Sequence, residues 1–369
     1  LGYAALFTQN FTSATSAYNT AVGSNAGLSV TTGVQNTLIG GLAGDAITTG
    51  HSNAAVGYRA LTTNTTAINC TALGKDALYA NTTGGDNTGV GYNSLAANTT
   101  GANNVAVGSL SLDANTTGDQ NVALGTSALG ALTAGDKNVA VGNSALAVFN
   151  VTDGSETFNT AVGYAAGGAV TTGVQNTLIG GLAGDALTTT GLNVAVGYNA
   201  LTTDTLGGYS TAIGHGSLGS QNFGSGTSSH NVAVGYQSGA SVTSGRFNTF
   251  LGSTTVGGDG AMNGAIVIGY NVTAASSTAG YATLGYGSTR TYIQLGTTTW
   301  VGTSDLRLKE NITDHTLGLG FINALRPVTY NWKKKKDVDT SLTDYFEEDS
   351  EERVNGTEAL RHGFIAQEV

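Results

Sequence analysis

The chain has 369 residues, of which 56 are glycine and one is proline, and its formal net charge is −10. Only 10% of the residues are charged, against about 25% in an ordinary globular domain. Without glycine at every third position and abundant proline it is not collagen, and a hydrophobic content of 40% argues against disorder. The acidic balance argues against a nucleic-acid partner, and no apolar run is long enough for a membrane-spanning helix.

A repeat of the form N-x-A-V-G-x-x-A-L dominates the first 300 residues. Its glycine recurs every 17 residues over three ranges: 23–142, 163–214 and 235–269. Steps of 21 residues join or precede these ranges: 2–23, 142–163 and 214–235. After Gly269 the register loosens, and Gly285 and Gly302 are the next expected members. Such a period is the signature of a solenoid.

Each repeat unit predicts a short strand before its glycine. An aliphatic residue precedes the glycine, a small residue lies two positions before it, and β-branched residues are frequent three positions before it. This alternation has the period of a strand with two distinct faces. A second apolar step such as Ala60-Leu61 and a polar N-T-T-G turn follow. We therefore expect an all-β fold, a parallel β-solenoid or β-roll of 17-residue coils with two short strands per coil.

Asparagine begins most repeat units, as at Asn53 and Asn87. Stacked coils place these side chains in one column, which predicts a ladder of amide hydrogen bonds between coils. Cys70 occupies one asparagine position, and we interpret it as a buried substitution rather than a catalytic thiol. The coils are thin and their core residues small, so lateral association of chains is expected.

The repeat resembles the N-x-x-V-G-x-x-S head repeats of trimeric autotransporter adhesins, although the 17-residue unit is longer than the usual coil of that family. The resemblance covers about residues 1–300. It implies a trimeric parallel β-roll, and hence a homotrimeric fibre with a shaft formed by residues 1–302.

The C-terminal segment, residues 303–369, has a different composition. It holds 22 of the 38 charged residues and the only proline. Its blocks TSDLRLKENI, LGLGFINALRPVTYNWK and HGFIAQEV resemble the intramolecular chaperone domain of phage tail spikes and fibres, peptidase family S74, known from endosialidases. The resemblance implies a small α+β domain that helps three chains to assemble and then cuts itself off between Ser304 and Asp305. Family domains continue past the last block, so we expect this one to be truncated at Val369.

The chemistry of that cleavage can be examined from the residues themselves. A serine hydroxyl needs a neighbouring base to become a nucleophile, and a lysine can serve as that base. Ser304 and Lys309 are five residues apart, and the family pattern places its nucleophile and its lysine at these positions. His362 is a possible assisting residue. The alternative is that Ser304 and Asp305 only cap a helix that begins near Leu306.

The 21-residue units carry phenylalanines that are candidate receptor contacts, because insertions in a solenoid form loops on one face. They are Phe7, Phe11, Phe149, Phe158 and Phe223. The same residues could instead seal the side of the core. Tyrosines that follow the repeat glycine, such as Tyr198, could stack on sugars or pack between chains. A threonine column eight residues after the glycine, such as Thr99, is better explained by turns than by ice binding.

These features predict a structural fibre rather than an enzyme that acts on external substrates. No cofactor motif and no metal-ligand spacing occur, and the first residue, Leu1, indicates a fragment at the N-terminus. We expect a virion tail fibre at the extracellular surface. Its partners would be two further copies of the chain, other tail proteins, and a host cell-surface glycan or protein receptor. One alternative is a bacterial cell-surface trimeric adhesin with the same self-cleaving chaperone. Another is a glycan-cleaving spike with catalytic residues in the shaft.

Overall fold

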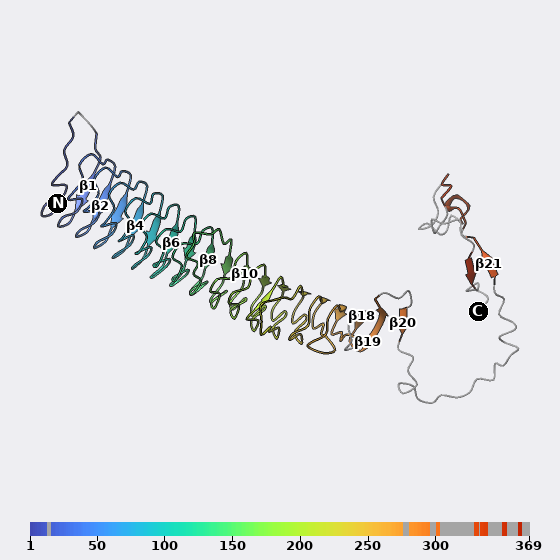
Figure 1. The fold of residues 1–369 in the computed structure, drawn as a ribbon. Helices are drawn as coiled ribbons and strands as arrows, with labels where there is room; N and C mark the ends of the chain where they lie inside the picture. The colour runs from blue at the N-terminus through green and yellow to red at the C-terminus, as the bar shows by residue number, and fades with distance from the viewer. Residues whose placement is uncertain are drawn as a thin grey trace. The chain divides into compact units, whose positions relative to one another are not determined.

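The computed structural model describes residues 1–12, 16–275, 280–295, 300–302, 328–331, 333–338, 349–352 and 361–363. The chain divides into two compact units, Leu1–Thr303 and Ser304–Val369. The first unit is a long stack of coils (Figure 1), and most coils contribute one three-residue strand. The recurring strands are β1 (Thr20–Val22), β2 (Thr37–Ile39), β3 (Ala54–Val56), β4 (Thr71–Leu73), β5 (Thr88–Val90), β6 (Val105–Val107), β7 (Val122–Leu124), β8 (Val139–Val141), β9 (Thr160–Val162), β10 (Thr177–Ile179), β11 (Val194–Val196), β13 (Thr211–Ile213), β15 (Val232–Val234), β16 (Thr249–Leu251), β17 (Ile266–Tyr270) and β18 (Tyr281–Tyr286).

These strands form one parallel sheet along the solenoid. Thr20 pairs with Thr37 and Thr37 with Ala54, so equivalent positions of neighbouring repeats lie side by side. The register follows the 17-residue period and absorbs the 21-residue steps without a slip, as in the pairing of Val139 with Thr160. The predicted all-β parallel solenoid of 17-residue coils is confirmed.

The repeat glycine is required by the close approach of neighbouring coils. Gly40 has φ of 136°, and a Cβ there would lie 2.3 Å from the carbonyl oxygen of Gly57. No L-residue fits such a contact or readily adopts that backbone conformation. The period of 17 is therefore set by a backbone contact as well as by the hydrophobic pattern.

The second apolar step is not a strand, and the expectation of two strands per coil is wrong. Residues two and four positions after the glycine, such as Arg59 and Leu61, have φ near +55°. Their amides still bond between coils: the Arg59 N–H donates to Gly41 O and the Leu61 N–H to Ala77 O, both at 3.0 Å. The segment is a run of alternating left-handed turns, and burial of the leucine offsets the unfavourable φ.

The interior is a narrow core of alanine and leucine. The middle residue of each recurring three-residue strand is buried while its two neighbours are not, so Ala55 faces the core between the more exposed Ala54 and Val56. Ala60 and Leu61 close the same core from the turn side, and both are fully buried. Such a thin core buries little surface for each residue. The stability of the solenoid therefore depends also on the polar bonds between coils.

Two buried asparagine columns supply those bonds. In the predicted ladder, the Asn104 amide donates to Gly118 O at 2.8 Å and its Oδ1 accepts the Asn121 N–H at 2.9 Å. The predicted ladder is confirmed, although most of its bonds run from side chain to backbone. The second column comes from the N-T-T-G turns: Asn98 donates to Asn81 Oδ1 at 2.7 Å and to Gly101 O at 2.8 Å.

Cys70 stands in the first column, is fully buried, and donates to Gly84 O at 3.4 Å. Its backbone N–H donates to Asn53 Oδ1 at 2.9 Å, which is the bond that the backbone N–H of an asparagine makes elsewhere in the column. Burial raises the pKa of the thiol to about 11. The interpretation of a buried substitution fits this environment, because a reactive cysteine needs a lowered pKa and exposure.

The solenoid changes character after β17. Gly285 pairs with Gly269 in the parallel sheet, but after a step of 16 rather than 17 residues. The chain then turns back: β19 (Thr289–Gln294) pairs antiparallel with β18, and β20 (Trp300–Gly302) pairs antiparallel with β19. Gly285 is thus a further coil member, whereas the expectation for Gly302 is wrong because it pairs in an antiparallel strand with Thr291.

The described residues of the second unit are few. β21 (Val328–Tyr330) pairs antiparallel with β22 (Arg361–Gly363), and a 3-10 turn spans Lys335–Asp337. Lys334 and Lys336 both pair with Glu351, and Lys335 pairs with Glu352. The basic and acidic runs of this segment therefore meet at an exposed surface, where such pairs add little stability.

Candidate functional site

The outer face of the parallel sheet is an uncharged surface that runs along the solenoid. It is formed by the residues one and three positions before each repeat glycine, and we call it the sheet face. The residue directly before the glycine is aliphatic in every recurring strand and is never buried. Val107 is 39% exposed, Leu73 48% and Leu251 47%. No charged residue occurs at either position in any of these strands.

Aromatic side chains form columns along both edges of the sheet face in its C-terminal half. One column follows the repeat glycine, where the His215 ring lies between those of Tyr198 and Tyr236 with centroids 5.5 and 5.3 Å away. The other column lies five residues before the glycine. It stacks Tyr209 on His230 at 4.9 Å and His230 on Phe247 at 5.4 Å. In each column the rings face one another, which leaves a free ring face only at the ends.

The sequence leaves two roles open for the phenylalanines of the 21-residue units, receptor contact and sealing of the core. Their burial in the structure differs. Phe149 is fully buried and Phe223 is 5% exposed, so these two seal the core. Phe7 is 76% exposed and Phe158 46%, and Phe11 is partly buried. Lys137 Nζ lies 5.4 Å from the centre of the Phe158 ring. Only Phe7 and Phe158 remain available as strongly exposed contacts.

The third 21-residue unit builds an extra wall on the solenoid. Its four additional residues allow β14 (Thr227–Ser228) to pair in parallel with β12 (Gly207–Gly208). Asp204 is buried beneath this wall, and its carboxylate accepts the N–H groups of Gly207 and Phe223 at 2.9 and 3.3 Å. Asp204 Oδ2 accepts the Gln221 amide at 2.5 Å. Three donors thus hold a buried acid and fix the start of the insertion.

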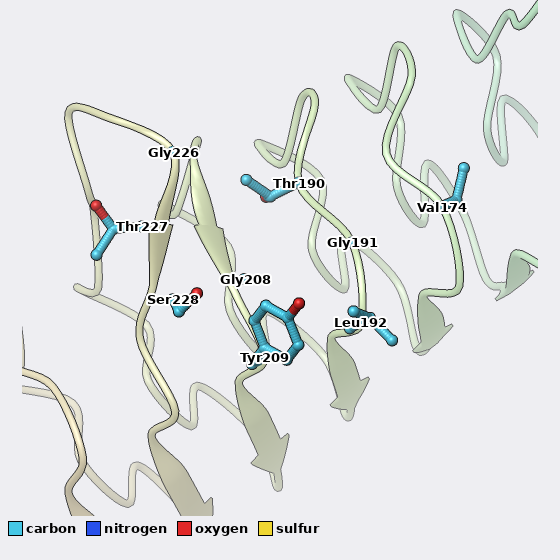
Figure 2. Close-up of a pocket in the computed structure, with 9 residues that line it drawn as sticks. All are labelled: Val174, Thr190, Gly191, Leu192, Gly208, Tyr209, Gly226, Thr227 and Ser228. Atoms are coloured by element: carbon cyan, nitrogen blue, oxygen red, sulfur yellow. The ribbon is translucent and has the colours of Figure 1, made fainter.

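A pocket of about 220 Å³ opens beside this wall (Figure 2). Three neighbouring coils line it through Val174, residues 190–192, and the pair Gly208 and Tyr209, and residues 226–228 of the insertion close it. Tyr209 and Leu192 are 48% and 44% exposed. These two residues occupy left-handed corners, with φ of 63°, so the pocket includes the corners of two coils and the chain segments that precede them, next to the sheet face.

The threonine and asparagine columns of the N-T-T-G turns are structural. The Thr99 hydroxyl donates to Thr116 O at 2.8 Å, and its neighbours in the column bond in the same way. These hydroxyls are therefore bound to the protein and do not form a free surface lattice. The N-T-T sequences of these turns also match the N-x-[ST] pattern of N-glycosylation sites, and their asparagines are fully buried: Asn64, Asn81, Asn98 and Asn115. An acceptor for glycosylation must be exposed, so none of the four fits that role in the folded solenoid.

The residues predicted for self-cleavage, Ser304, Asp305 and Lys309, lie outside the described residues. His362 belongs to β22, opposite Thr329 of β21. Among the described residues no group of histidine, cysteine, aspartate or glutamate side chains is arranged to hold a metal ion. In the same part of the chain no helix has the length and apolar character needed to cross a membrane.

Comparison with known proteins concerns the second unit. Residues 304–369 match the family model described as the chaperone of endosialidase, peptidase family S74. No curated protein and no solved structure matches the chain. A β-solenoid followed by a segment that matches this chaperone family is an arrangement that fits a tail-fibre-like protein.

Proposed function

We propose that this chain forms the shaft of a homotrimeric fibre that projects from a virion tail and contacts the host cell surface. In this proposal the C-terminal segment assembles three chains and then releases itself by cleavage between Ser304 and Asp305. Ser304 acts as nucleophile and Lys309 as its base. The partners are two further copies of the chain, other tail proteins, and a host glycan or protein receptor.

The observation that carries the proposal is the uncharged sheet face with its continuous column of aliphatic residues. Exposed apolar surface is usually scattered or limited to small patches on monomeric proteins, whereas here it follows the whole sheet. Fifteen strand spacings of about 4.8 Å give a stripe about 70 Å long, and three to four extended residues give a width of about 12 Å. The resulting area is on the order of 800 Å² per chain, which is the size of a stable interface.

The occupant that fits this stripe is another copy of the same stripe. Its length matches the length of the solenoid, and it has no charge for a charged partner to recognise. Three sheet faces around one axis bury all three stripes and leave the turn segments in water. The match of residues 304–369 to a chaperone family supports assisted assembly, because parallel chains with a repeating interface can otherwise pair out of register.

The proposal is tested by placing one charge on the sheet face. Val107→Asp puts a carboxylate on the stripe, and three copies bring three carboxylates together without partners. The matched control is Val148→Asp, because Val148 is an equally apolar residue, 46% exposed, that lies off the sheet face. Light scattering after size exclusion should give three chain masses for the wild type and for Val148→Asp, and a smaller particle for Val107→Asp.

Circular dichroism shows whether the variant chains keep their strands. A wild-type protein of one chain mass would refute the trimeric fibre. So would a Val107→Asp variant that assembles as well as Val148→Asp does, because the sheet face would then lie outside the interface.

A further inference from the structure

The Tyr209 ring is the last ring of its column. Its neighbour in the following coil is His230, which stacks on it at 4.9 Å with an interplanar angle of 29°. Its neighbour in the preceding coil is Leu192, which has no ring. Tyr209 therefore keeps one aromatic face free on the side of the pocket, and Figure 2 shows the ring between Gly208 and Leu192.

The rest of the pocket offers small polar groups and backbone. Thr227 and Ser228 stand on the insertion wall, and Thr190 stands on the opposite side, where its hydroxyl donates to Gly207 O at 3.0 Å. Within the described part of the chain, the Ser228 hydroxyl and the Tyr209 phenol make no hydrogen bond. No charged side chain lines the pocket. An anionic or cationic ligand would lose its hydration there without gaining a counter-charge.

We propose that this pocket binds one sugar ring of a neutral glycan. A pyranose combines an apolar C–H face, which stacks on a free aromatic ring, with hydroxyls that bond to small polar side chains and backbone groups. The volume of about 220 Å³ is at or below the lower limit of pockets for drug-sized ligands and suits one ring rather than several. The inference rests on the proposed function in one respect: that function places the glycan on the host cell surface.

The insertion explains why the site arises at this coil. Ordinary 17-residue coils pass directly from the polar turn to the asparagine column, whereas the four extra residues here raise β14 beside Tyr209. Asp204 and Gln221 hold the base of this wall from the interior. The pocket belongs to a single chain, and none of its lining residues occupies the two positions that form the sheet face, so formation of the trimer and binding of the sugar are separable properties.

Saturation-transfer difference NMR of the full-length protein tests the site. The probes are the methyl pyranosides of glucose, galactose, mannose and N-acetylglucosamine, each with a millimolar dissociation constant expected for a single ring. Tyr209→Ala should weaken binding of the recognised pyranoside at least tenfold. Tyr92→Ala is the matched control, because Tyr92 is also 48% exposed but does not line this pocket, and it should leave binding unchanged.

Ser228→Trp supplies a second variant in which the tyrosine is intact and the pocket is filled, and it should also abolish binding. Thermal unfolding monitors the fold of each variant. Binding by none of the probes, or binding that survives both Tyr209→Ala and Ser228→Trp, overturns the proposal. Loss of binding in Tyr92→Ala as well would show general stacking on exposed rings and would overturn it too. Each of these outcomes is independent of the chain count measured by light scattering.

Discussion

The Leu38 side chain lies beside Gly44. In the following coil the equivalent space is filled by the leucine of the turn segment, Leu61. A Cβ on Gly44 would lie 2.8 Å from Leu38 Cδ2. In that coil the sizes are exchanged, with Ala55 in the strand and Leu61 in the turn, both fully buried. Gly44 and Leu61 share nearly the same φ, 55° and 56°. The strand thus supplies the large residue at this place in the first coil and the turn supplies it in the second, and in the first coil Ile47 also borders Gly44, with its Cδ1 2.7 Å from such a Cβ.

This relationship predicts strong coupling between the two positions. Leu38→Ala should cost about 3 kcal/mol of unfolding free energy, because it leaves a cavity in a thin core. Gly44→Leu alone should also destabilise by about 2 kcal/mol through overpacking. The double variant recreates the pairing of Ala55 with Leu61 and should be more stable than the sum of the single changes predicts. Urea unfolding of the four proteins measures this coupling.

The second copy of the same sequence offers an internal control for that cycle. Leu178 and Gly184 repeat the arrangement, and a Cβ on Gly184 would lie 2.7 Å from Leu178 Cδ2. The cycle at this pair should give a coupling free energy of the same sign. Additive effects at both pairs would contradict the exchange of sizes between strand and turn.

The buried asparagine column of the turns predicts a large difference between two similar substitutions. Asn98→Asp replaces an amide that donates to Asn81 Oδ1 and Gly101 O by a group that only accepts. We expect a loss of about 3 kcal/mol or more. Asn103→Asp is the matched control, because Asn103 is exposed and an aspartate, Asp86, stands at the same position one coil earlier. Equal melting temperatures for the two variants would rule out a structural role for the column.

The buried thiol of Cys70 predicts slow reactivity and a specific loss of stability at high pH. Its pKa is raised from 9.0 to about 11 by burial. Above pH 9 the unfolded chain gains a thiolate that the folded chain does not, so stability falls between pH 9 and 11, by on the order of 2 kcal/mol. Cys70→Ser should lack this part of the decline. In the native wild type a thiol reagent at pH 8 should modify Cys70 only on unfolding, and rapid native labelling would contradict its burial.

Self-cleavage predicts a defined pair of products. The full-length wild type should give a shaft that ends at Ser304 and a fragment that begins at Asp305, whereas Ser304→Ala and Lys309→Ala should remain intact. Ser350→Ala, which changes another serine of the same unit, should cleave normally. Intact mass and a denaturing gel measure the outcome. If a wild type whose C-terminal region is complete stays whole, self-cleavage is ruled out, the helix-cap alternative holds for Ser304, and the chaperone remains part of the filament.

The strands and the first asparagine column follow directly from the sequence, because both depend on residue type at a fixed spacing. The left-handed Leu61 could not be predicted in this way, since leucine disfavours that φ and only burial in the assembled core offsets its cost. The second asparagine column, with Asn98, does not follow from the sequence, because asparagine is favoured in turns as well as in ladders. The pocket beside Tyr209 was missed because its wall depends on the path of the insertion, which Asp204 fixes through contacts distant in sequence.

The central claim is that three chains associate through their sheet faces. Electron cryomicroscopy of the assembled shaft tests it most directly, because a cross-section shows both the number of solenoids and the side that each turns toward the axis. The account predicts three solenoids with Val107 and its equivalents pointing inward and the pocket beside Tyr209 open to solvent. Single solenoids, or a bundle with the sheet faces turned outward, would contradict it.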